Sequence, residues 1–110
     1  MEIKKNKEYT LVIPTENTVN EFFKIFKENQ SNFENEHVIV DFSEKINMNI
    51  EEIMLFLKLS LTRKKAGTSF VLVCNGINID EIPDEMNIIP TFTEALDILE
   101  MDAIERDLGF

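Results

Sequence analysis

Few residues in this 110-residue chain have the types and spacing that catalysis or metal binding requires. It contains one histidine, His37, and one cysteine, Cys74, so a site that needs two histidines or a cysteine pair cannot form within the chain. His37 begins one apolar run and Cys74 ends another, which favours a strand-edge histidine and an inert buried thiol. The glycines at 67, 76 and 109 do not form a phosphate-binding loop.

The charged clusters give no better candidate for a catalytic site. Two acidic pairs, Asp80–Glu81 and Asp84–Glu85, stand in a polar connection without the alternation and glycine of a calcium loop. The basic cluster Arg63-Lys64-Lys65 falls in the last turn of a predicted helix, where cations complement the helix dipole. Contact with an anion or an acidic partner is the alternative interpretation. We expect no enzymatic activity, no metal and no cofactor.

The net charge of −10 argues against nucleic-acid and membrane-surface roles, because an acidic field repels polyanions. The charge is −1 over residues 1–75 and −9 over residues 76–110. The acidic block is interpreted either as a solvated surface or as a docking surface for a basic partner. No apolar run approaches the roughly 20 residues that cross a bilayer, and the N-terminus has no secretory signal pattern. We expect a cytoplasmic protein with a free thiol.

The hydrophobic pattern predicts strands that alternate with helices. Strands are expected at 9–13, 37–42, 69–74 and 87–89. Helices are expected from 18 to about 29–32, from 49 to 64 or 65, and from 91 to about 107. Thr18, Asn49 and Thr91 each stand three residues before a glutamate, which is N-capping spacing. The alternation is typical of an α/β fold whose parallel strands are connected by helical crossovers.

The order of these parts resembles a STAS domain, the small domain of bacterial anti-sigma factor antagonists. The matching segments are His37-Val-Ile-Val-Asp-Phe-Ser43, Arg63-Lys-Lys-Ala-Gly67, Phe70-Val-Leu-Val73 and Thr91-Phe-Thr-Glu-Ala-Leu96. The resemblance covers roughly residues 9–98. It implies a single α/β domain over residues 1–110, with a mixed sheet of about four strands, βαβ crossovers and helices packed mainly on one face. Residues 99–110 would form an acidic helical extension.

In that family, phosphorylation of a serine that follows an aspartate at the start of the second helix controls partner binding. Counted from Asp41 without gaps, the Asp-Ser-Ser/Thr-Gly positions are Asn49, Ile50, Glu51 and Glu52. The phosphoacceptor is therefore missing. The resemblance implies a non-catalytic regulatory protein-interaction domain that is not switched at this position. Glu51 and Glu52 either stabilise the helix N-terminus or mimic a phosphorylated state permanently.

Two of the predicted helices carry apolar residues on two sides. In the second helix, Ile50, Ile53, Met54, Leu57 and Leu61 form the predicted core stripe, and Leu55, Phe56 and Leu59 lie opposite. In the last helix, Phe92, Ala95, Leu96, Leu99 and Ala103 form the predicted core stripe, and Met101, Ile104 and Leu108 lie opposite. The second stripes are either covered within the chain or exposed as a patch for homodimerisation or a separate partner.

The resemblance, together with the second apolar stripe, predicts a partner-binding site at the start and on the outer face of the second helix. Its candidate residues are Met48, Asn49, Ile50, Glu51, Leu55, Phe56 and Leu59, and a tail interface would add Met101, Ile104, Leu108 and Phe110. The expected partner is an anti-sigma-factor-like or other regulatory protein, or a second copy of the chain. The alternatives are a module that binds a nucleotide or lipid between strand ends and helix N-termini, and a self-associating structural protein.

Overall fold

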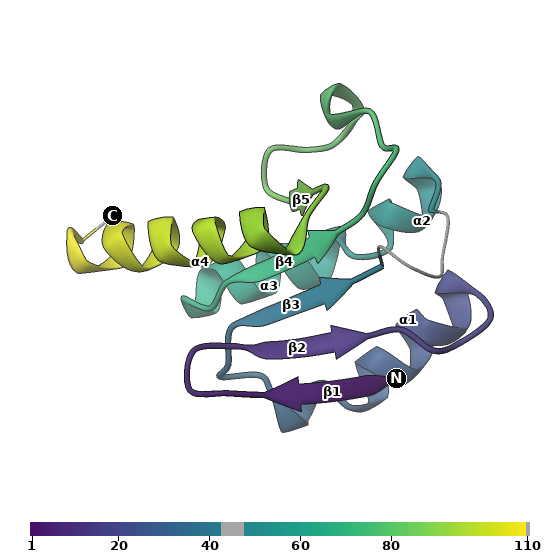
Figure 1. Cartoon of the computed structure of the whole chain (residues 1–110), viewed down its shortest axis with the longest axis horizontal. Helices are drawn as coiled ribbons and strands as arrows, with labels where there is room; N and C mark the ends of the chain where they lie inside the picture. Colours follow the sequence, from purple (N-terminus) through teal and green to yellow (C-terminus); the bar gives the residue numbers. More distant parts are fainter. Residues whose placement is uncertain (43–47, 110) are drawn as a thin grey trace.

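The computed structural model describes residues 1–42 and 48–109, and five strands form one mixed sheet in the order β1-β2-β3-β4-β5 (Figure 1). The strands are β1 (Glu2–Lys5), β2 (Thr10–Ile13), β3 (Val38–Asp41), β4 (Phe70–Val73) and β5 (Asn87–Ile89). Strands β2 to β5 are parallel, and β1 pairs antiparallel with β2. The four predicted strands are confirmed. β1 is an additional strand, and its residues are exposed throughout, which explains why no apolar pattern indicated it.

Three of the four helices in the described residues, α1 (Val19–Glu28), α2 (Ile50–Met54) and α4 (Phe92–Asp107), begin where the capping residues predict. The fourth is α3 (Leu57–Ala66), and the 3-10 turns are η1 (Gln30–Asn32) and η2 (Ile79–Glu81). The side chains of Thr18, Asn49 and Thr91 accept the backbone N–H groups of the glutamates three residues later. At Asn49 the capping box is complete, because Glu52 also accepts the Asn49 N–H at 3.1 Å.

The predicted helix over residues 49–65 is broken in two, and this break changes which side chains are buried. The N–H of Leu55 bonds to the carbonyl of Glu52 at 3.2 Å, and the N–H of Phe56 bonds to the carbonyl of Ile53 at 3.0 Å. These bonds span three residues instead of four, so the chain turns more tightly here than in an α-helix. The uninterrupted step of 100° per residue therefore gives the wrong faces after Met54.

Helices cover both faces of the sheet. α1, α2 and α3 pack over one face, and α4 packs over β4 and β5 on the other (Figure 1). In β3, Val38 and Val40 point into the first core and Ile39 into the second. Three helices thus share one face, as the resemblance implied, and α4 covers the other. This double covering explains why β3 and β4 lack polar alternation.

Candidate partner-binding surfaces

Phe56 and Leu59 do not form an exposed patch: of the two alternatives for this stripe, the structure shows coverage within the chain, and their place in the predicted partner-binding surface is corrected accordingly. Phe56 is fully buried, Leu59 is buried, and Leu55 is half-buried against the same core. The ring of Phe56 lies 5.0 Å from that of Phe23 and 5.8 Å from that of Phe42, measured between centroids. The break between α2 and α3 turns these side chains inward, toward the aromatic core.

A different set of side chains is exposed at the start of α2, before the break. Met54, predicted to be in the core, is 36% exposed, and Ile50, one helical turn before it, is half-buried. Asn49 and Glu51 are exposed, whereas Met48 is buried. We call Asn49, Ile50, Glu51 and Met54 the α2 surface. It follows β3 in the chain and therefore belongs to the edge where the parallel strands end; Ser43, between β3 and α2, lies outside the described residues.

The two glutamates of α2 have different roles. Glu52 completes the capping box with Asn49, which supports the interpretation that it stabilises the helix. Glu51 is exposed in the first turn, where the helix dipole favours a negative charge. Ile50, at the position where the resemblance places the phosphoacceptor, has no hydroxyl group.

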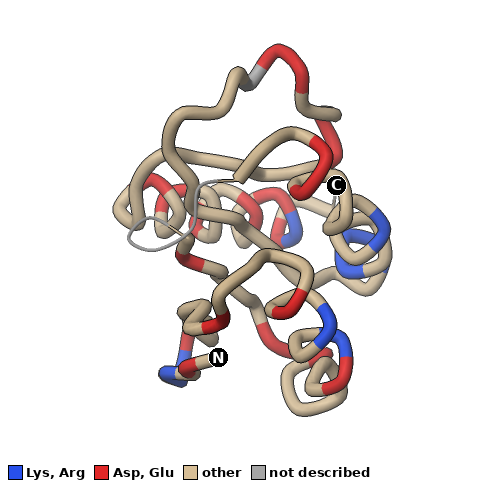
Figure 2. Tube along the Cα trace, turned by 90° about the vertical axis from the view of Figure 1, so that its right-hand side faces the viewer, with Lys and Arg blue, Asp and Glu red and all other residues tan. Residues whose placement is uncertain are grey.

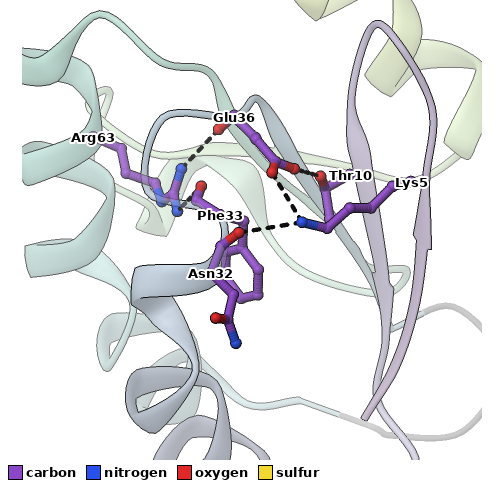
Figure 3. Close-up of polar contacts among 6 residues, drawn as sticks. All are labelled: Lys5, Thr10, Asn32, Phe33, Glu36 and Arg63. Atoms are coloured by element: carbon purple, nitrogen blue, oxygen red, sulfur yellow. Dashed lines mark hydrogen bonds and ion pairs between the residues drawn. The ribbon is translucent and has the colours of Figure 1, made fainter.

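Arg63 does not belong to a basic surface, because its side chain enters the core. It is 2% exposed, and its guanidinium donates to the carbonyl oxygens of Phe33 and Glu36, each at 2.9 Å (Figure 3). The guanidinium also lies over the rings of Phe33 and Phe70, 5.8 and 5.7 Å from their centroids. Burial lowers the pKa of Arg63. Arg63 therefore ties α3 to the segment before β3. Of the basic cluster 63–65, Lys64 and Lys65 remain exposed.

Glu36 joins that segment to the first two strands. Its carboxylate accepts the hydroxyl of Thr10 and the ammonium of Lys5, the latter at 2.9 Å (Figure 3). Lys5 also donates to the carbonyl of Asn32 at 3.2 Å. The Thr10 hydrogen bond, and after it the Lys5 contact, lower the pKa of Glu36. These contacts are structural, since they pair groups of the chain with one another.

A second polar cluster contains His37, Ser69, Asp102 and Arg106, which fasten α4 to the start of β3 and β4. The Ser69 hydroxyl donates to Asp102 Oδ2 at 2.7 Å, and the Ser69 backbone N–H donates to His37 Nδ1 at 2.9 Å. The arrangement differs from a Ser-His-Asp triad, because His37 contacts the backbone N–H of Ser69 and the hydroxyl bonds Asp102. Sequence analysis found only His37 of this cluster, because the contacts join residues that are 32 to 69 positions apart.

The protonation of His37 follows from its neighbours. A ring whose Nδ1 accepts the Ser69 N–H is neutral and carries its proton on Nε2. Arg106 Nη2 lies 3.4 Å from that Nε2, so the contact sets a cation beside an N–H group. Burial first, and then the charge of Arg106, lower the pKa of His37, and Asp102 opposes this shift.

The remaining candidates for chemistry are inert or scattered. Cys74 is buried, as predicted, and burial raises the pKa of its thiol. Among residues 1–42 and 48–109, no three histidine, cysteine, aspartate or glutamate side chains cluster in a way that can hold a metal ion.

None of the helices in the described part of the chain combines the length and the apolar character that crossing a membrane requires.

Two cavities flank the second half of α4. One, of about 450 Å³, lies between α3, β5 and α4, and the other, of about 1010 Å³, lies between α4 and the turn after β1. Ser69 and His37, which line them, stand at the amino ends of β4 and β3. The ligand alternative predicted a cleft at the opposite edge, where the strands end and the helices begin. These cavities therefore do not support it.

The C-terminal stripe is exposed in the structure. Met101, Ile104 and Leu108 are 56%, 53% and 67% exposed, and Ala95, on the core side of the same helix, is fully buried. α4 continues without a break from Phe92 to Asp107, across the expected start of the extension at residue 99. Phe110, the last residue of the predicted tail interface, lies outside the described residues.

Comparison with known proteins shows the fold. No protein-family model matches the sequence, and no curated protein matches it. The structure matches a crystal structure of a candidate anti-sigma factor antagonist from Thermotoga maritima over 90% of this chain and 93% of that one, with a TM-score of 0.66 and 17% sequence identity. It also matches a chain in the molecular architecture of the stressosome, described as a signal integration and transduction hub. That match covers 93% of this chain and 98% of the other, with a TM-score of 0.58 and 19% identity.

At these identities the likeness concerns the fold alone. The chain has a STAS-like fold, as the resemblance in its sequence implied, with five strands instead of about four.

Proposed function

We propose that this chain is a non-catalytic regulatory domain that binds a protein partner through the α2 surface. The observation that carries the proposal is the exposure of Met54 beside Ile50 and Glu51 at the edge where β3 ends. Two apolar side chains four residues apart lie next to each other on a helix and can enter one pocket of a partner. The structural neighbours, a candidate anti-sigma factor antagonist and a stressosome chain, support a regulatory role.

We propose further that this contact is constitutive with respect to phosphorylation at position 50. A kinase needs a hydroxyl group, and Ile50 offers a hydrocarbon side chain in its place. The half-buried Ile50 adds apolar contact area at the centre of the α2 surface. Partner binding is then controlled by the amounts of the two proteins or by a modification elsewhere.

The apolar and acidic side chains of the α2 surface indicate which groups a partner must present. An apolar pocket would accept Met54 and Ile50, and the flexible thioether of Met54 adapts to pockets of irregular shape. A lysine or arginine beside that pocket would pair with Glu51. An anti-sigma-factor-like or other regulatory protein with these two features is the partner that we expect.

The geometry of the polar clusters supports the non-catalytic part of the proposal. Ser69 bonds Asp102 through its hydroxyl, His37 accepts a backbone N–H, and Cys74 is buried with a raised pKa. These contacts do not form a Ser-His-Asp or Cys-His arrangement, because His37 bonds a backbone N–H and Cys74 is enclosed in the core.

Affinity capture with matched variants tests the proposal. The wild-type chain, the double variant Glu51→Lys/Met54→Lys and the double variant Glu2→Lys/Ile3→Lys are immobilised, and proteins retained from the source cells are quantified by mass spectrometry. The second variant makes the same chemical change on β1, where Glu2 and Ile3 are also exposed. Thermal unfolding confirms that both variants are folded.

We expect a protein that the wild type and the β1 variant retain and the α2 variant releases, with at least about tenfold less captured. Phosphatase treatment of the extract and of the chain should leave the capture unchanged. Equal retention by all three chains would contradict the proposed surface, and capture that depends on phosphate on this chain would contradict the constitutive contact.

A further inference from the structure

The second half of α4 presents an apolar stripe that the rest of the described chain does not cover. Met101, Ile104 and Leu108 recur at spacings of three and four residues, so they lie on one side of the helix. All three are more than half exposed. In Figure 1, this part of α4 extends past the ends of the strands toward the C-terminus. The sheet therefore supports the first half of the helix and leaves the second half with a free outer side.

The surroundings of this stripe are acidic. Asp97, Glu100, Glu105 and Asp107 are exposed on α4, and none of them forms an ion pair within residues 1–42 and 48–109. Arg106 is the only basic residue after position 75, and it turns toward Ser69 and His37. Figure 2 shows further acidic segments, in red, in the loop at the top of the molecule that joins β4 to β5. A partner of this surface must carry positive charge.

The cavity of about 450 Å³ next to Met101 is a place where a positively charged side chain of the partner can bind. Four carboxylates line it: Asp84, Glu85, Asp102 and Glu105. Two cations, Lys64 and Arg106, also line it, so the carboxylates outnumber them. Phe70 and Ile98 supply an apolar wall. A cavity with acidic groups and an apolar wall suits a long basic side chain, whose hydrocarbon stem packs while its charged end meets carboxylates.

A second copy of the chain fits this surface poorly. A symmetric contact would set the acidic flanks of the two copies against each other. The charge therefore favours a separate basic partner.

From these observations we propose that the outer side of α4, with the cavity beside Met101, binds an amphipathic basic helix of a protein partner. Apolar residues of that helix pack on Met101, Ile104 and Leu108, and a lysine or arginine at its margin enters the cavity toward Glu105. This surface is distinct from the α2 surface, so the chain has two docking sites. A domain with two such sites can hold two proteins together.

Synthetic peptides test the proposal without knowledge of the partner. The probe is a fluorescein-labelled peptide of about five helical turns, with leucines on one side and lysine and arginine at the margins. One control peptide has the same composition with the leucines distributed around the helix, and another carries glutamate in place of every basic residue. Binding is followed by fluorescence anisotropy at low and at raised ionic strength.

Matched protein variants locate the binding. Met101→Ser/Ile104→Ser removes two exposed apolar side chains of α4, and Ile3→Ser/Leu61→Ser removes two exposed apolar side chains elsewhere, both without a change in charge. Glu105→Gln is compared with Glu2→Gln in the same way. Glu51→Lys, on the α2 surface, separates this proposal from the first one.

We expect the amphipathic basic peptide to bind, and its affinity to fall about tenfold in the Met101/Ile104 variant and severalfold in Glu105→Gln. The Ile3/Leu61, Glu2 and Glu51 variants should bind it like the wild type. Raised ionic strength should weaken binding, and amide chemical shifts should move in residues 97–108.

Three results would overturn the proposal. The first is equal binding of the peptide with distributed leucines, which would mean attraction by overall charge alone. The second is equal weakening in the α4 and control variants. The third is a dimer in sedimentation that the Met101/Ile104 variant dissociates, which would make the surface a contact between copies of this chain.

Discussion

The two faces of the sheet use apolar residues in opposite ways. Beneath α1, α2 and α3, rings of phenylalanine fill a continuous core in which Phe56 contacts four other rings. Beneath α4, the fully enclosed set is small, with Ile39, Val71, Val73 and Ala95. The apolar stripe of Leu55, Phe56 and Leu59, at the junction of α2 and α3, is thus taken into the core, whereas the stripe of Met101, Ile104 and Leu108 on α4 extends past the sheet and stays exposed. Whether a second stripe is core or surface depends on where the sheet ends.

The largest effect on stability is expected from a substitution in the phenylalanine core beneath α1, α2 and α3. We expect Phe56→Ala to lower the free energy of unfolding by about 3–5 kcal/mol, because it removes a fully buried ring and leaves a cavity. Leu61→Ala, at a neighbouring but exposed position, should cost less than about 0.5 kcal/mol. Urea unfolding measures both. A smaller loss of stability for Phe56→Ala than for Leu61→Ala would contradict the burial of Phe56 in the core.

The next largest loss of stability is expected from removing the guanidinium of Arg63, which is buried in the same core. Arg63→Met keeps much of the side-chain volume but leaves the carbonyls of Phe33 and Glu36 without their donors. We expect a loss of about 2–3 kcal/mol, as for hydrogen bonds from a charged group. Lys64→Met, one residue later and exposed, should be nearly neutral in the same urea titration. If the two variants were equally stable, Arg63 would not be part of the core.

A smaller loss of stability is expected on the other face of the sheet, where polar contacts hold α4. Ser69→Ala removes the hydroxyl that donates to Asp102 and should cost about 1 kcal/mol. Because Asp102 lies in the second half of α4, hydrogen exchange of amides near residues 100–107 should accelerate more than that of amides in β3. Thr68→Ala provides the control from the preceding position. Uniform acceleration over the whole chain would show that the contact does not act locally.

The smallest effect is a dependence on pH at the same contact. The pKa of His37 is lowered in the folded chain, so the unfolded chain binds a proton first when the pH falls below about 6.5, and stability falls with it. His37→Asn keeps an acceptor near the Nδ1 position and does not titrate there. We expect its stability to change less than that of the wild type between about pH 7 and pH 5.

A second loss should follow at lower pH, in both proteins. The pKa values of Glu16 and Glu36 are also lowered, so stability that is present above about pH 4.5 disappears as these carboxylates are protonated. Urea unfolding at a series of pH values separates the two ranges. Parallel curves for the wild type and His37→Asn above about pH 5 would exclude His37 as the group responsible.

Much of the fold was predictable because its signals are local. The runs 37–42 and 69–74 read as strands from consecutive apolar residues, and Thr18, Asn49 and Thr91 marked helix starts by their spacing to a glutamate. β1 gave no such signal, since an exposed edge strand of four residues needs no apolar alternation. It forms by pairing with β2, a contact that the residues of β1 alone do not reveal.

The burial of the candidate residues was predicted in part. Periodicity assumes an unbroken helix, and the tighter turn at Leu55 and Phe56 gives Phe56 a place in the core that this assumption does not predict. Met54 precedes that turn and is exposed, because α2 faces the core with Ile53. For the outer stripe of α4 the sequence left coverage and exposure open, and the structure shows the stripe exposed on a helix that is continuous from Phe92 to Asp107. The partners of Arg63 lie about 30 positions away, at Phe33 and Glu36, where local patterns carry no information.

The central claim is that the α2 surface, with Met54 at its edge, is where this STAS-like domain binds a protein partner. Its most direct test is calorimetric titration of the purified partner, once captured, into the wild-type chain and into the Met54→Lys and Ile3→Lys variants. The account predicts binding at least about tenfold weaker for Met54→Lys and unchanged for Ile3→Lys. Equal affinities for all three proteins would contradict it.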